Sequence, residues 1–372
     1  MAEWIDCKIA DLGTVIGGAT PSTKKLEYYE NGSIAWITPK DLSTFRGRYI
    51  RRGERNITEL GLKSCSTQLL PKNTVLFSSR APIGYIAIAE NELCTNQGFK
   101  SVIPNENTDP LFLYYLLKYN KIKIESMGSG TTFKEISGNT MKNIVVSVPR
   151  DKKVQEQISS ILGAIDNKIE SNEKINNNLE QQAIAIFDNM FPNISTAEKT
   201  IGDIIIPKRG KSLLSKNAIF GSVPVVAGGL NPSTYHNTAN TVAPVLSISA
   251  SGANAGYVSL WTMPIWSSDS SFIDSSMSND VYFWYVLLKK RQNEIYDSQT
   301  GSAQPHIYPQ HIAAMPICDL NFNKVSNYTS TVTPIFELIG HNKIENMRLI
   351  TIRDTLVPKL ISGDLDVSNI SL

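Results

Sequence analysis

Two histidines lie five positions apart in the stretch "TGSAQPHIYPQHIAAMPI", residues 300–317. His306 and His311 carry imidazoles, which bind metals and transfer protons near neutral pH. A fainter copy of the stretch, "GSGTTFKEISGNTMKNIVVSV" at 128–148, contains no histidine. The property that the two copies share is therefore not imidazole chemistry, and we expect neither histidine to be catalytic.

The rest of the sequence contains no complete catalytic or cofactor motif. "PKRGKS" (207–212) resembles the end of a phosphate-binding loop, but Ile205 occupies the position of its first glycine. "NPST" (231–234) lacks the second proline and the aromatic residue of the Asn-Pro-Pro-aromatic clamp that holds a flipped base. The four cysteines form no Cys-x-x-Cys pair, which argues against a zinc site and a disulfide framework. We predict no catalytic residue, no metal and no bound cofactor.

Composition places the chain among ordinary globular proteins of more than one domain. It has 372 residues, 41% of them hydrophobic, and a net charge of +2. Residues 1–150 contain 19 Lys and Arg against 14 Asp and Glu, whereas residues 193–319 contain 8 of each. This modest basic excess in the first part is suited to phosphate contacts. Without a signal-like segment or an apolar run of about 18 residues, we expect a cytoplasmic protein.

The sequence contains an internal repeat, which is the strongest signal of its architecture. Segments of the first part recur in the same order in the second part, at offsets that fall from 192 to 171. The pairs are "KIADLGTVIGG" (8–18) with "TIGDIIIPKRG" (200–210), "GSIAWITPKDLS" (32–43) with "GSVPVVAGGLN" (221–231), "VLFSSRAPIGYIAI" (75–88) with "VLSISASGANAGYVSL" (245–260), and "FLYYLLK" (112–118) with "FWYVLLK" (283–289). Two similar globular domains are therefore expected.

A long helical segment follows each copy, at about 150–191 and 324–361. Apolar residues recur three, four or seven positions apart, and the first helix would be about 60 Å long. We predict that the two helices pair as an antiparallel coiled coil, although each could instead cap its own domain. The predicted seam residues are Ile158, Ile165, Ile169, Leu179, Val332, Ile339 and Met347. Asn172, Asn176 and Asn178 near the seam either fix its register or mark a solvated stretch.

These observations predict an α+β protein with two similar globular domains, joined by two long paired helices and related by an approximate two-fold axis. The predicted boundaries are 1–150 for the first domain, 151–192 for the first helix, 193–319 for the second domain, 320–362 for the second helix and 363–372 for a tail.

Loops at equivalent places in the two copies are the expected binding elements, because function is usually carried by loops on a rigid scaffold. Their side chains suit nucleic acid, since Arg and Lys contact phosphate or guanine and Asn and Gln pair with adenine. An arginine-rich strip, "FRGRYIRRGER" (45–55), is either a solvated loop or a phosphate contact. The candidate DNA-binding residues are Ser78, Ser79, Arg80, Asn96, Gln97, Thr131, Lys134, Arg46, Arg48, Lys211, Ser251, Asn254, Ser268, Asp269, Gln304 and His306.

The chain resembles the specificity subunits of type I restriction-modification systems along its full length. The resemblance rests on "GSAQPHI" with "GSGTTFKEI", on "TNQGF", and on "QEQISSILGAIDNKIE" and "TPIFELIGHNKIENMRLITIRDTLVPKLISGDL". It implies a non-catalytic subunit with two target-recognition domains, each of which reads one half of a bipartite asymmetric DNA site. The helices would set the spacing between the half-sites.

The resemblance also implies partners. The helices would dock modification (methyltransferase) subunits, two per chain, which bind S-adenosylmethionine and methylate adenine. Restriction subunits that use ATP and Mg²⁺ would join some complexes. Two alternatives remain at this point: a two-headed scaffold that binds protein rather than DNA, and a cryptic nuclease or methyltransferase. Binding that persists at high salt would favour the scaffold, and activity of the purified chain alone would favour the enzyme.

Overall fold

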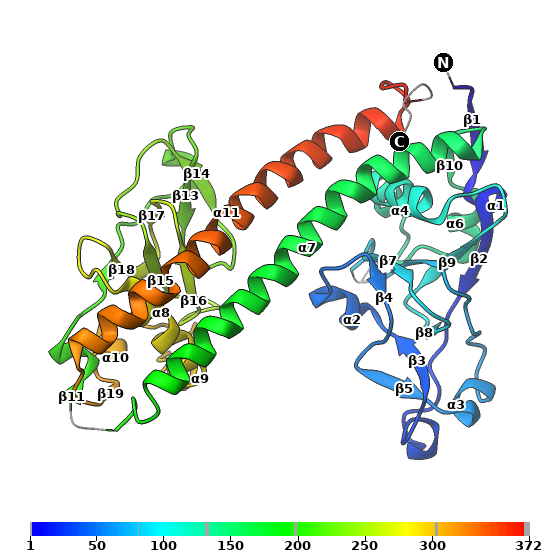
Figure 1. The fold of residues 1–372 in the computed structure, drawn as a ribbon. Coiled ribbons are helices and arrows are strands. Elements are labelled where there is room, and N and C mark those ends of the chain that lie inside the picture. The colour runs from blue at the N-terminus through cyan, green and yellow to red at the C-terminus, as the bar shows by residue number, and fades with distance from the viewer. Residues whose placement is uncertain (1, 81, 131–133, 197–198, 302–303, 368–372) are drawn as a thin grey trace. The chain divides into compact units, whose positions relative to one another are not determined.

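The computed structural model describes residues 2–80, 82–130, 134–196, 199–301 and 304–367. The chain folds into two compact units. Unit 1 comprises Met1–Glu170 and Met347–Leu372, and unit 2 comprises Ser171–Asn346. Both boundaries fall inside the long helices α7 (Lys152–Met190) and α11 (Phe322–Ile361), so each unit contains part of each helix (Figure 1).

Unit 1 is built on three sheets, the largest of which has five strands in the order β2-β9-β6-β7-β4. These strands are β2 (Gly13–Gly17), β9 (Lys100–Pro104), β6 (Val75–Phe77), β7 (Ile86–Ala89) and β4 (Tyr49–Ile50). A three-stranded sheet contains β5 (Arg55–Ile57), β3 (Ile34–Ile37) and β8 (Cys94–Thr95), and a two-stranded sheet contains β1 (Trp4–Lys8) and β10 (Val145–Pro149).

The main core helix of unit 1 is α4 (Pro110–Tyr119), whose residues 112–117 are all buried. The side chain of Asp109 caps its first turn by accepting from the amide of Phe112 at 2.7 Å, and Pro110 has the fixed φ that suits a first helical position. The shorter helices are α1 (Ile9–Leu12), η1 (Leu26–Tyr28), α2 (Pro39–Thr44), α3 (Glu59–Lys63), α5 (Lys121–Ser126) and α6 (Gly138–Asn143).

Unit 2 repeats this plan. A four-stranded sheet contains β12 (Lys208–Arg209), β18 (Ser270–Asp274), β15 (Val245–Ser249) and β16 (Val258–Trp261). A three-stranded sheet contains β14 (Thr234–His236), β13 (Val223–Val226) and β17 (Trp266–Ser267). A two-stranded sheet contains β11 (Lys199–Thr200) and β19 (Pro316–Ile317). Its helices are η2 (Ile201–Asp203), η3 (Ser215–Asn217), α8 (Val281–Lys290), α9 (Gln292–Asp297) and α10 (Pro309–Ala313).

The strand orders confirm the internal repeat. The order β2-β9-β6-β7 in unit 1 corresponds to β12-β18-β15-β16 in unit 2. In the smaller sheets, β3 pairs antiparallel with β5 and parallel with β8, as β13 does with β14 and β17. Among the described residues of unit 2, no strand corresponds to β4. The predicted α+β class is therefore also confirmed.

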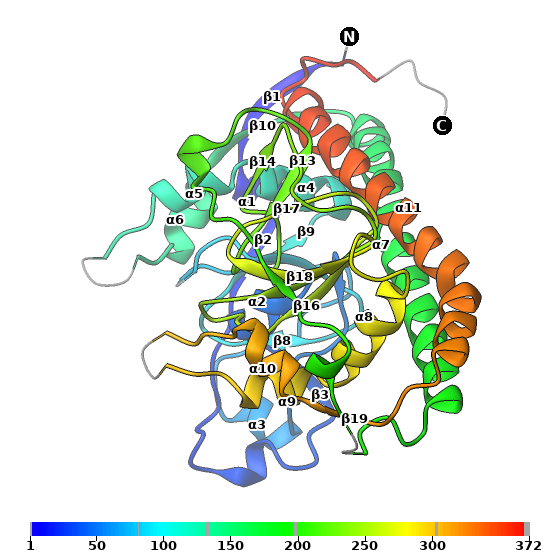
Figure 2. The ribbon, with the colours of Figure 1, turned by 90° about the vertical axis from the view of Figure 1, so that its left-hand side faces the viewer.

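The two long helices run antiparallel in each unit, as predicted. In unit 1, Arg353 of α11 donates to Asp166 of α7 at 2.8 Å. In unit 2, Asn342 donates to Asn176 at 2.8 Å, and the hydroxyl of Tyr328 donates to the carbonyl of Ala183 at 3.0 Å. Residue numbers rise on one helix as they fall on the other. Figures 1 and 2 both show α7 and α11 side by side.

The helices also cap their units, so the two alternatives for their apolar stripes are both realised. Val154, Ile158 and Leu162 of α7 belong to the same buried cluster as the apolar residues of α4. Leu360 and Ile361 near the end of α11 join that cluster.

The seam between the helices contains a polar layer. Of the predicted seam residues, Ile158, Ile169, Val332 and Ile339 are buried, whereas Ile165 and Leu179 are half-buried. Met347, also predicted for the seam, is 37% exposed, whereas the neighbouring Asn346 is buried. Asn172 is 1% exposed and donates to Asn346 at 2.8 Å. A buried, paired asparagine favours the register-fixing interpretation of the seam asparagines.

Candidate nucleic-acid interface

Three of the predicted loops of unit 1 meet at one place, joined by backbone hydrogen bonds. The amide of Ser79 donates to the carbonyl of Gly98 at 2.7 Å, and the amide of Ile136 donates to the carbonyl of Ser79 at 2.8 Å. The loops at 78–84 and 94–99 therefore lie against the end of the third loop. Thr131, a candidate in that third loop, lies outside the described residues.

The turn Asn96–Gly98 is held rigidly. The amide of Asn96 donates to the carbonyl of Ile37 on β3 at 3.0 Å, which continues the parallel pairing of β3 with β8. The side-chain oxygen of Asn96 accepts from the amide of Gly98 at 2.9 Å. This local hydrogen bond is the kind by which asparagine stabilises a turn.

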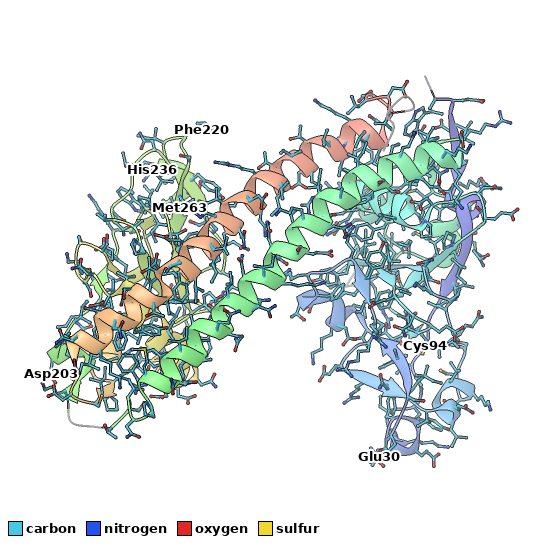
Figure 3. All side chains as sticks on the ribbon, viewed as in Figure 1. Glu30, Cys94, Asp203, Phe220, His236 and Met263 are labelled. Carbon is cyan, nitrogen blue, oxygen red and sulfur yellow. The ribbon has the colours of Figure 1, made fainter. Side chains whose placement is uncertain are left out.

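Cys94 on β8 precedes the turn and anchors it to the core of unit 1. Its thiol is buried in the interior of unit 1, where the label in Figure 3 marks it, and donates to the carbonyl of Ala35 at 3.4 Å. Burial raises the pKa of this thiol to about 12, so it stays protonated near neutral pH. The side chain therefore acts as a packed anchor of β8 rather than as a reactive group.

A fourth segment, Gly18–Thr20, contacts the same turn. It is not among the loops that the sequence predicted. The amide of Ala19 donates to the carbonyl of Thr95 at 3.1 Å, and the hydroxyl of Thr20 donates to the side-chain oxygen of Gln97. A Cβ on Gly18 would lie 2.2 Å from the carbonyl oxygens of both Thr95 and Asn96. The match between Gly18 and Gly210 in the repeat was the sequence signal for this close approach.

Unit 2 brings its equivalent loops together in the same way. The amide of Ala250 donates to the carbonyl of Asp269 at 3.1 Å, and the amide of Ile307 donates to the carbonyl of Ala250 at 2.9 Å. The amide of Lys211 donates to the carbonyl of Ser267 at 2.9 Å, and a Cβ on Gly210 would lie 2.4 Å from that carbonyl oxygen. The loop clusters of the two units therefore share one backbone plan.

Four candidate side chains of unit 1 remain available at its loop cluster. Gln97 and Lys134 are exposed, and Arg80 and Asn96 are half-buried. Within the described part of the chain, no acceptor is recorded for the guanidinium of Arg80. On the arginine-rich strip, Arg46 is exposed.

Ser78 and Ser79 are corrections to the predicted set, because both are 0% exposed. The hydroxyl of Ser78 donates to the carbonyl of Pro82 and accepts from the amide of Tyr85, both at 2.8 Å. These bonds close the loop from inside. The predictions that the two hydroxyls contact DNA are therefore wrong. The hydroxyl of Ser78 closes the loop instead, and Ser79 joins the loops through its backbone.

Arg48 is a further correction, since its side chain is 4% exposed. Its Nε donates to Oε1 of Glu170 on α7 at 2.9 Å, and its Nη2 donates to the side-chain oxygen of Asn167. Burial is the largest single effect and lowers the pKa of Arg48, but the hydrogen bond to Glu170 and the nearby charges of Glu170 and Asp166 together outweigh it, so the pKa lies above its ordinary value. The guanidinium holds the strip 45–55 to α7 and is not free for a phosphate.

The available side chains of unit 2 have a different chemistry. Oδ1 of Asp269 accepts from Nη2 of Arg209 at 2.6 Å, and Oδ2 accepts from the hydroxyl of Ser251. The side chain of Asp269 keeps 36% of its surface exposed. Lys211 and Gln304 are exposed, and Ser251, Asn254 and His306 are half-buried.

Ser268 is also a correction to the predicted set of DNA-binding residues. Its side chain is 5% exposed, and its hydroxyl oxygen accepts from the amide of Leu213 at 2.9 Å. This bond fixes the segment that follows β12 against the turn after β17. The prediction that Ser268 contacts a base is therefore wrong.

Three histidines of unit 2, His236, His306 and His311, have local structural partners. The backbone of His306 exchanges hydrogen bonds with Thr300 at 2.8 and 3.0 Å, and Nδ1 of His311 accepts from the amide of Tyr308 at 3.3 Å. His236, labelled in Figure 3, accepts from the amide of Ile219 at 2.9 Å. Among the described residues, no group of three or more His, Cys, Asp or Glu is placed to hold a metal. The loop 300–307 leads into α10 before the closing strand β19.

No helix in the described ranges combines the length and the apolar character that crossing a bilayer requires.

Comparisons with known proteins agree on one family. Residues 1–181 match the type I restriction modification DNA specificity domain. The chain is 33% identical over 99% of its length to the type I restriction enzyme MjaIX specificity subunit of Methanocaldococcus jannaschii, of which it covers 95%. It is 31% identical to the EcoR124I/EcoR124II specificity subunit of Escherichia coli, over 42% of this chain and 40% of that one.

A solved structure shows the same fold. The S subunit of a type I restriction-modification system from M. genitalium aligns with 99% of this chain and 97% of its own, with a TM-score of 0.63 and 20% identity. Together with the identity to the M. jannaschii subunit along almost the whole chain, these matches show that the protein belongs to the specificity subunits of type I restriction-modification systems.

Proposed function

We propose that units 1 and 2 each read one half of a bipartite, asymmetric DNA site. The protein is a DNA-specificity component, because its family is defined by a DNA specificity domain. One observation supports the assignment of one half-site to each unit: the two loop clusters have the same backbone hydrogen bonds but different side chains. Gln97 and Arg80 lie in the loop cluster of unit 1, whereas Asp269 and Ser251 lie in that of unit 2. Equal scaffolds with unequal side chains suit two different half-sequences.

Electrostatic attraction to DNA belongs mainly to unit 1 in this proposal. Arg80 and Lys134 stand at its loop cluster, and Arg46, Arg51, Arg52 and Arg55 of the strip 45–55 are exposed. In unit 2 the loop cluster has one exposed lysine, Lys211, among its described residues, and Arg209 is paired with Asp269. Phosphate contacts supply most of the affinity for DNA whatever the sequence. Unit 1 would therefore anchor the chain, and unit 2 would add mainly specificity.

The helices α7 and α11 are proposed to set the spacing between the half-sites and to dock the modification subunits, two per chain. Both boundaries between the units lie within helix, whose rise of about 1.5 Å per residue resists change. Large apolar side chains remain exposed on both helices, as expected of a docking surface. They are Ile175, Phe322, Leu338, Met347, Ile350 and Ile352. S-adenosylmethionine, ATP and Mg²⁺ would be bound by the partner subunits.

A salt series tests whether the chain binds DNA rather than protein. We expect the affinity for duplex DNA to fall on the order of a hundredfold between about 50 and 200 mM salt, if about four phosphates are contacted. The variants Arg80→Gln and Lys134→Gln should each reduce the slope of log affinity against log salt by about one. Fluorescence anisotropy of a labelled duplex measures this slope.

Arg150→Gln is the matched control for these variants. Arg150 is also an exposed cation of unit 1, but it pairs with Glu3 at 3.0 Å and lies outside the loop cluster. Its replacement should leave the slope unchanged. A wild-type chain that binds no duplex even at about 50 mM salt would contradict DNA binding, and an affinity that does not respond to salt would contradict the proposed phosphate contacts.

A further inference from the structure

The turns that follow β8 and β17 occupy the same place in the two units but differ in length and chemistry. In unit 1 the turn is Asn96–Gly98, and in unit 2 it is the shorter Ser268–Asp269. Asn96 and Ser268 both donate their amides to the neighbouring strand, at 3.0 and 2.8 Å. Gln97 and Asp269 are the solvent-reaching side chains of these turns.

The turn of unit 1 presents hydrogen-bond donors. The side-chain oxygen of Asn96 is occupied by the amide of Gly98 at 2.9 Å, and that of Gln97 by the hydroxyl of Thr20. The NH₂ groups of both side chains remain without partners among the described residues. Arg80 beside them has donors only.

A carboxylate close to this turn is partly engaged. Glu135 lies beside Arg80 in the backbone ladder, and its Oε1 accepts from Nζ of Lys100 at 3.5 Å. The groups that border the turn are therefore mainly donors, with Lys134 as a further one, while the side chain of Glu135 keeps 42% of its surface exposed.

The turn of unit 2 presents an acceptor. Asp269 is a carboxylate, which has no hydrogen to donate when ionised and about four acceptor sites. One site on each oxygen is used, by Arg209 at 2.6 Å and by Ser251. These two bonds fix the direction of the carboxylate while 36% of its side-chain surface stays exposed. The remaining acceptor sites face solvent.

The base edges in the major groove distinguish these two surfaces. Guanine presents two acceptors, N7 and O6, and thymine presents one, O4, whereas cytosine presents the N4 amino donor and adenine the N6 amino donor beside its N7 acceptor. Several donors side by side therefore fit guanine best. We propose that unit 1 reads a guanine edge through Asn96, Gln97 and Arg80, and that unit 2 reads an amino group of cytosine or adenine through Asp269. This inference rests on the proposed function, because it assumes that each loop cluster faces one half-site.

The test exchanges the hydrogen-bonding character of each turn without changing its shape. Wild-type full-length chain, Gln97→Glu and Asp269→Asn are each used to select duplexes from a pool with randomised base pairs, and the bound fraction is sequenced. Gln68→Glu and Glu337→Gln are the matched controls, since both residues are exposed and lie outside the loop clusters.

We expect wild type to enrich a two-part motif with guanine in one half and a cytosine or adenine contact in the other. Gln97→Glu should lower the preference for guanine about tenfold in the first half only, because a bidentate base contact is worth a factor of this order. Asp269→Asn should change a base in the second half only. The unchanged half in each variant shows that the protein is still folded, and the controls should enrich the wild-type motif.

Two results would overturn the inference and leave the proposed function standing: a first half without guanine, or a motif that neither variant alters. A wild-type chain that enriches no sequence would overturn the proposed function, and this inference with it.

Discussion

Replacing Glu170 by leucine is expected to lower the free energy of unfolding of unit 1 by about 3–5 kcal/mol, because it leaves a buried guanidinium without its carboxylate. Arg48 is 4% exposed, whereas the side chain of Glu170 is 26% exposed. The loss of Glu170 leaves the cation with the side-chain oxygen of Asn167 and with a carbonyl 3.5 Å away, that of Gly163. Neither of these oxygens carries a formal charge.

Because Arg48 is more deeply buried than Glu170, removing one residue of the ion pair should not cost the same as removing the other. Arg48→Met should cost less than Glu170→Leu, because the orphaned Glu170 can still reach water. The double variant should recover most of the loss, since removing both members of a buried ion pair is often nearly neutral. Urea unfolding of the full-length single and double variants measures these differences.

An exposed pair provides the control. Arg150 and Glu3 are 67% and 64% exposed in their ion pair, so Arg150→Met should cost no more than about 1 kcal/mol. If Glu170→Leu costs as little as this control, the guanidinium of Arg48 is not held by α7. Arg48 would then return to the set of candidate phosphate contacts.

Gly18→Ala is expected to destabilise unit 1 by about 1–3 kcal/mol, as overpacking does in a closely packed region. A Cβ there would lie 2.2 Å from two backbone carbonyl oxygens, so the side chains cannot relieve the clash by rotating. The turn Asn96–Gly98 would have to shift, and with it Gln97. We therefore expect loss of base preference in the half-site that unit 1 reads.

The neighbouring glycine is a matched control. A Cβ on Gly17 would meet nothing closer than 4.0 Å, so Gly17→Ala should change stability by no more than about 0.5 kcal/mol. Urea unfolding measures the stability of each variant, and selection from randomised duplexes measures the base preference. Wild-type base preference in Gly18→Ala would show that Gly18–Thr20 does not position the reading turn.

The architecture could be predicted because its signals are long or repeated. The helices α7 and α11 extend over 39 and 40 residues, so their apolar periodicity is unambiguous. Each weak strand pattern occurs twice in the repeat, so one copy supports the prediction made from the other. Strands such as β8 and β17, with two residues each, lie below what a pattern can detect alone.

The candidate site was only partly predictable, because burial depends on partners that are distant in sequence. Arg48 lies in a run of arginines that is typical of an exposed strip, yet its partner Glu170 is 122 residues away. Ser78, Ser79 and Ser268 are small polar residues in loops, and no sequence pattern distinguishes a hydroxyl that faces inward from one that faces outward. The loops themselves were correctly located, since flanking strands and the repeat mark their positions.

A genome-wide map of methylated adenines tests the specificity assignment most directly. The map is made in cells that carry this chain with its modification subunits, with the gene intact and with it deleted. We predict that deletion removes methylation from one two-part asymmetric motif and leaves all other motifs unchanged. Methylation that persists at every motif after the deletion would contradict the assignment.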